Sequence, residues 1–263
     1  MLLSEIVKIL DEALKIEIAY EWDNVGLLVG DKEKNINKIM LALEITKETI
    51  DEAKKNSIDL IISHHPLIFK ALKTITTDHE KSKYIIDAIK NDIAIYSSHT
   101  NFDMISDGLN DYVANLLELE DVKSLVYETS QEFGIGRIGK LRSEMNINEF
   151  SSYVIKKLNL SDIKVVRGSD ESIKKVAVVN GSGIEYWKEA KALGCDIYVT
   201  GDVKYHEAQD IKETGMSIID AGHYGTEKHF NVAMKNFLKD ILSEDIEIYT
   251  STSMEDPFLA IQA

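Results

Sequence analysis

The feature of this sequence that most constrains its fold is an alternation of short apolar runs with amphipathic segments, which occurs twice along the chain. The apolar runs occupy residues 39–45, 59–63 and 92–98, and then 174–181, 195–200 and 216–220. Helical patterns separate them at 46–56, 81–90, 184–194 and 206–213. Short buried strands that alternate with helices are typical of a mainly parallel sheet covered by helices. We therefore expect an α/β fold with two similar lobes, each a parallel or mixed sheet covered by helices.

The two halves can be aligned on each other, which indicates an internal duplication. Adding 137 to the numbers of five residues gives residues of the same type: Lys38, Glu52, Ala53, Lys54 and Asp59 correspond to Lys175, Glu189, Ala190, Lys191 and Asp196. Between the halves, residues 121–170 resemble a connector, with an extended segment at 132–141 and an amphipathic helix at 146–160. We place the first lobe at residues 1–125, and the connector with the second lobe at 126–263.

Composition excludes several classes of protein. The chain has 263 residues and one cysteine, so it has no disulfide framework and no cysteine-based metal cluster, and it suits a reducing compartment. No segment has the run of about 18 uncharged residues that a membrane helix needs, and the N-terminal helical pattern carries charges where a signal peptide is apolar. A net charge of −15 disfavours broad binding to nucleic acids. We expect a soluble cytoplasmic protein.

Histidines gather where predicted strands end. His64 and His65 follow the run at 59–63, His99 follows the run at 92–98, and His206 and His223 follow the last two runs. Ligands bind at the carboxyl ends of strands in open α/β sheets. These five positions therefore predict a functional site.

Two of these histidines have a carboxylate four residues later, in the pairs His99/Asp103 and His223/Glu227, which correspond at an offset of 124. Residues four apart share one face of a helical turn, so each pair can converge on one point. Adjacent His64 and His65 point apart at a strand end, which suits two different ions. Imidazole and carboxylate ligands suit Zn, Fe or Mn. The pattern predicts a dinuclear centre in which Glu227 bridges the two metals.

Each of these residues also has a structural interpretation. His99 and His206 are also consistent with hydrogen-bonded loop residues, and Glu227 with a favourable charge in the first turn of a helix. Trp22 is expected in the core or at an interface. The glycine-rich segment NGSG (180–183) follows a strand, and its amides are suited either to an anion or to a tight turn. Taken together, five ligand-type residues on matching strand ends favour a metal site.

Five segments of the chain resemble the signature motifs of the Nif-three-like family, whose members are often labelled GTP cyclohydrolase 1 type 2 homologues. The segments are WDNVGLLVG, IISHHPLIF, IAIYSSHTNFD, YVTGDVKYHEA and IIDAGHYGTEK, in family order. The resemblance implies two similar lobes with a dinuclear metal site in the cleft between them, and a ring-shaped homohexamer. The sequence departs from the family pattern at Glu44, where Asp is usual, and at Asn180 of NGSG, where Gly is common.

The motifs also imply which residues bind the metals. The ligands of two divalent ions would be His64, His65, Asp103, His223 and Glu227, and His99 would lie beside the metals. Longer relatives carry an extra domain between the lobes, for which residues 121–170 are too short.

Three functions are compatible with this site. The first is a metal-dependent hydrolase acting on a small molecule, with His99 or His206 as general acid or base and Lys204 meeting an anionic substrate. A metal-delivery protein and a regulatory binding protein are the alternatives. The negative net charge disfavours a nucleotide substrate, unless the ions and Lys204 offset the repulsion locally.

Overall fold

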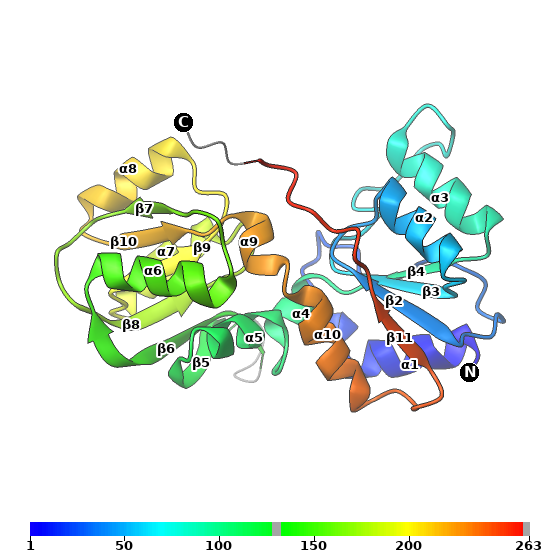
Figure 1. The fold of residues 1–263 in the computed structure, drawn as a ribbon, viewed down its shortest axis with the longest axis horizontal. Coiled ribbons are helices and arrows are strands. Elements are labelled where there is room, and N and C mark those ends of the chain that lie inside the picture. The colour runs from blue at the N-terminus through cyan, green and yellow to red at the C-terminus, as the bar shows by residue number, and fades with distance from the viewer. Residues whose placement is uncertain (128–132, 260–263) are drawn as a thin grey trace. The chain divides into compact units, whose positions relative to one another are not determined.

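The computed structural model describes residues 1–127 and 133–259; Glu132, the first residue of the predicted extended segment, lies outside them. The described residues form two compact α/β units, each with its own sheet (Figure 1). The first unit comprises residues 1–105 and 230–255. The second comprises residues 106–229 and the segment that begins at Asp256. The chain therefore leaves the first unit after residue 105, returns to it at residue 230 and leaves it again after residue 255.

The first unit has a five-stranded sheet in the order β1-β4-β3-β2-β11. Its strands are β1 (Gly26–Val29), β2 (Lys38–Ala42), β3 (Leu60–Ser63), β4 (Ala94–Ser97) and β11 (Glu247–Thr250). Its helices are α1 (Leu3–Ala13), α2 (Lys47–Lys55), α3 (Glu80–Lys90), α4 (Thr100–Met104) and α10 (Phe230–Lys239), with a 3-10 turn, η1 (Ile16–Ile18). Strands β11, β2, β3 and β4 are parallel, and β1 is antiparallel to β4.

The second unit has a six-stranded sheet in the order β5-β6-β8-β9-β10-β7. Its strands are β5 (Glu120–Tyr127), β6 (Gly134–Met145), β7 (Lys164–Val166), β8 (Ile173–Val178), β9 (Ile197–Thr200) and β10 (Ser217–Asp220). Its helices are α5 (Leu109–Leu116), α6 (Ile147–Leu158), α7 (Trp187–Ala192), α8 (Tyr205–Glu213) and α9 (His223–Glu227), with a 3-10 turn, η2 (Ile184–Tyr186). The predicted connector thus contributes β5, β6 and β7 to this sheet.

Helices cover the sheets of both units. In the first unit, alternate residues of β2, β3 and β4 pack against the apolar stripes of α2 and α3. The opposite face meets α1, whose Asp11 accepts a hydrogen bond from Tyr96 of β4 (2.9 Å). In the second unit, β8, β9 and β10 pack against α5 and α6. These layers confirm the predicted α/β class with two helix-covered sheets.

The topology repeats as the alignment of the two halves predicts. In both units three parallel strands lie side by side, β2-β3-β4 and β8-β9-β10, and an antiparallel strand pairs with the last of them. Asp59 and Asp196, which correspond at the offset of 137, make equivalent contacts. Asp59 accepts hydrogen bonds from the backbone N–H groups of Asn37 and Lys38, and Asp196 accepts them from Lys174 and Lys175.

Two predictions concern the chain as a whole. None of the helices in the described residues combines the length and apolar character that a bilayer crossing requires. The limits of the two lobes, 1–125 for the first and 126–263 for the connector with the second, stay a prediction.

The single cysteine gives a test of the second core. Cys195 is buried at the start of β9, and burial raises the pKa of its thiol to about 12. Because the thiolate is the reactive species, we expect native protein to react very slowly with a thiol-specific disulfide reagent near neutral pH, and denatured protein to react fully. The rate of chromophore release measures this. Fast reaction of native protein, at a rate unaffected by denaturant, would contradict the packing described.

Candidate metal centre

The candidate site in the first unit begins with the pairing of β3 and β4. These strands are parallel, with Ser63 opposite Ser97. The ladder continues one residue further, where the Ser98 N–H donates to the Ser63 carbonyl (2.9 Å). Because both strands end at the same edge, the histidines that follow them emerge together.

Three of the predicted site histidines cluster at this edge. One ring nitrogen from each of His64, His65 and His99 lies within 4.8 Å of the other two. His64 is fully buried, and its Nε2 lies 3.8 Å from Oδ2 of Asp103 on α4. The first unit thus brings together His64, His65, His99 and Asp103, as the sequence predicts.

The orientation of each imidazole is fixed through Nδ1. The Nδ1 atom of His64 lies 3.0 Å from the Ser98 carbonyl oxygen, and that of His65 lies 2.9 Å from Glu44 Oε2. The Nδ1 atom of His99 lies 3.0 Å from both carboxylate oxygens of Asp23. Carbonyl and carboxylate oxygens only accept hydrogen bonds, so in the neutral imidazole Nδ1 carries the proton and Nε2 keeps its lone pair. This is the arrangement in which a histidine binds a metal through Nε2.

Asp23 is the most firmly held of these partners, and the sequence did not identify it. Its side chain is inaccessible to solvent and accepts hydrogen bonds from the Thr100 N–H (3.1 Å) and hydroxyl (2.6 Å). Burial raises the pKa of Asp23, but the hydrogen bonds with His99 and Thr100 outweigh burial and lower the pKa to about 2. Asp23 is therefore ionised at neutral pH and holds the His99 ring.

Glu44, noted above as a departure from the family pattern, still places a carboxylate against Nδ1 of His65. Its second oxygen accepts a hydrogen bond from Lys81 at the start of α3 (2.6 Å). Burial raises the pKa of Glu44, but the hydrogen bonds from His65 and Lys81 hold it below its usual range. Glu44 thus holds His65 and is held itself by a lysine.

The second unit brings His223 and Glu227 together on α9. His223 Nε2 lies 2.9 Å from Glu227 Oε2, four residues later in the helix. Its Nδ1 lies 2.7 Å from Asp202 Oδ2, so a carboxylate again fixes the ring. Asp202 was also missed by sequence analysis; its only signal is its place just after β9. Glu227 is almost completely buried.

The glycine-rich turn after β8 packs closely against the side chain of Glu227. The Gly181 N–H donates to the Thr226 hydroxyl (2.8 Å), and the Gly183 N–H donates to the Thr200 hydroxyl (3.1 Å). These two amides are therefore occupied within the protein, which favours the tight-turn interpretation over the anion cradle. Gly181 has φ +61°, and a Cβ on it would lie 2.2 Å from Glu227 Oε1. Only glycine lets the turn approach the carboxylate this closely.

Three other residues that the sequence analysis singles out have exposed side chains. His206 lies in the first turn of α8 with an exposed side chain, and its ring contacts Tyr205. The roles of His206 and of the exposed Lys204 therefore stay predictions. Trp22, expected in the core or at an interface, is 57% exposed in this chain, so the core assignment is wrong. Large apolar side chains are exposed where binding surfaces form as well as buried in cores, and residue type does not distinguish the two.

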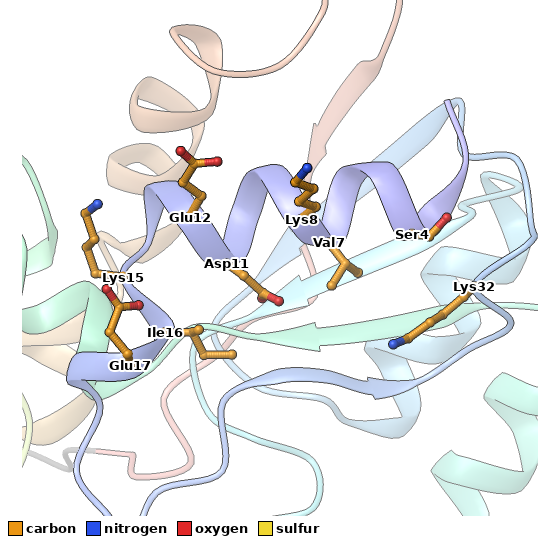
Figure 2. Close-up of a pocket in the computed structure, with 9 residues that line it drawn as sticks. All are labelled: Ser4, Val7, Lys8, Asp11, Glu12, Lys15, Ile16, Glu17 and Lys32. Carbon is orange, nitrogen blue, oxygen red and sulfur yellow. The ribbon is translucent and has the colours of Figure 1, made fainter.

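A hollow of about 590 Å³ lies apart from these histidines, along α1 (Figure 2). Lysines and carboxylates line it, among them Lys8, Asp11 and Lys32. Its lining contains none of the predicted site residues, so it is not part of the candidate metal centre.

Several known proteins are similar to this chain over nearly its whole length. The model of the family Duf34/NIF3 (NGG1p interacting factor 3) matches residues 1–257. A Clostridium perfringens protein named GTP cyclohydrolase 1 type 2 homolog is 41% identical over 261 residues, covering 98% of this chain and 99% of the relative. A crystal structure of a Bacillus cereus protein related to NIF3 is 28% identical, with a TM-score of 0.91 and 99% of both chains covered. Reduced HcgD from Methanocaldococcus jannaschii is 32% identical, with a TM-score of 0.81 and coverage of 95% and 97%.

The fixed Nδ1 atoms give a direct test of the site. In metal-free protein we expect the ring ¹⁵N spectra of His64, His65 and His99 to show protonated Nδ1 and unprotonated Nε2. Asp23→Ala removes the acceptor of His99 and should shift His99 alone toward a mixture of tautomers. Glu21→Ala, an exposed acid on the same loop, is the control and should leave the spectrum unchanged. A predominantly Nε2-protonated His99 in the unsubstituted protein would refute the assignment.

Proposed function

Since the chain belongs to the Duf34/NIF3 family, we propose that it is a metal-dependent hydrolase that holds two divalent ions in one dinuclear centre. The observation that carries the proposal is the set of histidines whose Nδ1 atoms are fixed by oxygen acceptors. In the first unit three such rings gather their nitrogens within 4.8 Å, and in the second a fourth such ring lies against Glu227. A structural histidine needs neither this shared orientation nor these neighbours.

The proposed ligands are His64, His65 and Asp103 from the first unit, and His223 and Glu227 from the second. The donor set fits divalent Zn, Fe or Mn, because neutral imidazoles and carboxylates provide all the donors. Asp103 and Glu227 are both buried. Burying ionised carboxylates is costly unless positive charge compensates them, and divalent ions supply that charge.

His99 is the proposed proton-transfer group. When bound, the ions would act as Lewis acids toward the substrate and the attacking water. His99 lies beside His64 and His65 but has a partner of its own, the ionised Asp23. A carboxylate on Nδ1 orients the imidazole and stabilises it when it takes up a proton at Nε2. His99 can therefore accept a proton from water and return it to the leaving group.

The substrate and the assembly are proposed only at a coarse level. The name of the Clostridium perfringens relative points to cyclohydrolase chemistry on a small molecule, which is one form of C–N bond hydrolysis. Formation of a homohexamer and localisation in the cytoplasm stay predictions. Lys204 would meet an anionic group if the substrate carries one.

The proposal can be tested with metal analysis and a hydrolase screen on the same preparations. Unsubstituted protein purified anaerobically should hold two ions per chain. His65→Ala and Glu227→Gln should each lose metal, because both residues are proposed ligands. His99→Gln should keep its metal but lose about 10²–10⁴-fold in turnover, the usual contribution of a general acid or base.

His79→Ala, an exposed histidine at the start of α3, is the matched control and should change neither property. Less than one ion per chain in the unsubstituted protein would refute the dinuclear centre. Two firmly held ions without turnover of any substrate would refute the hydrolase. Release of those ions to a metal-free client enzyme would support the metal-delivery alternative instead.

A glycine pair isolates the role of Glu227. Gly181 and Gly194 both have positive φ, +61° and +71°, so alanine strains the backbone at either position. A methyl group at Gly181 would collide with Glu227, whereas at Gly194 it would meet nothing within 4 Å. We expect Gly181→Ala to lower metal content markedly and Gly194→Ala to leave it intact, with both variants losing some thermal stability. Equal metal content in the two variants would show that Glu227 is not a ligand.

A further inference from the structure

A cluster of three aromatic side chains lies beside His99, and two of its members contact the His99 ring. The indole of Trp22 stacks on Tyr20, with centroids 5.4 Å apart and an interplanar angle of 22°. Phe69 meets Trp22 edge to face at 5.9 Å. Trp22 and Phe69 also lie beside His99, with ring centroids 6.2 Å and 6.5 Å from the centroid of the His99 ring. We call Tyr20, Trp22 and Phe69 the aromatic surface.

The backbone on both sides of the aromatic surface is fixed. The backbone N–H of Tyr20 donates to the hydroxyl of Thr100 (3.3 Å). The same hydroxyl donates to Asp23. The Asn24 side chain donates to the carbonyl of Ile68, which directly precedes Phe69. The segment that carries Trp22 is thus tied both to the start of α4 and to the segment that carries Phe69. The rings are held in place before any ligand arrives.

The aromatic surface is exposed although it is apolar. Trp22 is 57% exposed and Phe69 44% exposed. Burying an aromatic side chain is favourable, so a rigid cluster left accessible beside a functional group is typical of a binding surface. Its position next to His99 links it to a small-molecule site rather than to a remote docking patch.

We propose that the aromatic surface binds a planar heteroaromatic ring of the substrate and holds it beside His99. The inference rests on the proposed hydrolase function, because it takes His99 as the proton-transfer group. Flat aromatic side chains select ring faces and edges by stacking and give little discrimination among aliphatic groups. The bond to be cleaved would then lie in the ring or directly attached to it.

The two tryptophans allow a matched binding experiment, because the chain has only Trp22 and Trp187. Trp187→Phe leaves Trp22 as the only tryptophan, and Trp22→Phe leaves Trp187, which lies in the second unit. We expect guanosine and adenosine to quench Trp22 fluorescence saturably and to leave Trp187 unaffected. Uncharged nucleosides are the probes because the net charge of −15 repels polyanions. Ribose, which lacks an aromatic ring, should quench neither.

Phe69→Leu tests the site without disturbing the core, because Phe69 is exposed. In the Trp187→Phe background it should weaken nucleoside binding about tenfold or more, as loss of a stacking partner does. Metal content should be unchanged in Phe69→Leu. Conversely, Glu227→Gln should lose metal and still bind nucleosides, so failure of the metal centre and failure of this inference are separable.

Two results would overturn the inference. One is equal quenching of Trp22 and Trp187, or none at all, across the nucleosides. The other is Trp22 fluorescence that depends on protein concentration but not on nucleosides, with Phe69→Leu altering the oligomeric state. That outcome would assign the aromatic surface to contact with a second copy of the chain.

Discussion

The parallel register of β3 and β4 is the constraint on which the candidate site depends. With Ser63 opposite Ser97, the next residues of the two strands leave the sheet side by side. Ser98 then acts twice: its N–H extends the ladder to Ser63, and its carbonyl holds Nδ1 of His64. A slip of one residue would reverse the faces of the strand and remove this carbonyl from His64. The sheet therefore orients the imidazole as well as placing it.

The acids around the histidines divide into two groups by what they contact. Asp23, Glu44 and Asp202 each accept a hydrogen bond at Nδ1 of a histidine, which leaves Nε2 as the atom available to a metal. Asp103 and Glu227 instead lie on the Nε2 side, facing His64 and His223. A carboxylate that faces Nδ1 thus fixes a ring, and one that faces Nε2 is placed to join the proposed ligand set.

The sequence predicts the scaffold well because strand and helix periodicity are local properties. It also predicts the duplication, and Asp59 and Asp196 make equivalent backbone contacts in the two units. The partners of the histidines could not be predicted in the same way. Asp23 lies 76 residues before His99, and only the folded chain brings them together. Trp22 shows the same limit: its residue type indicated either the core or an interface, and only the fold excludes the core.

Duplication also explains why the first unit contains a histidine beyond the proposed ligands. His99 and His223 correspond in the two units, and each has an aspartate on Nδ1. The units then differ. His223 lies 2.9 Å from the carboxylate four residues later, whereas in the first unit that position, Asp103, faces His64. In the proposed centre His64 and His65 are the histidine ligands of the first unit, so His99 does not need the ligand role proposed for His223. An oriented imidazole beside a metal centre, but not required as a ligand, is what proton transfer needs.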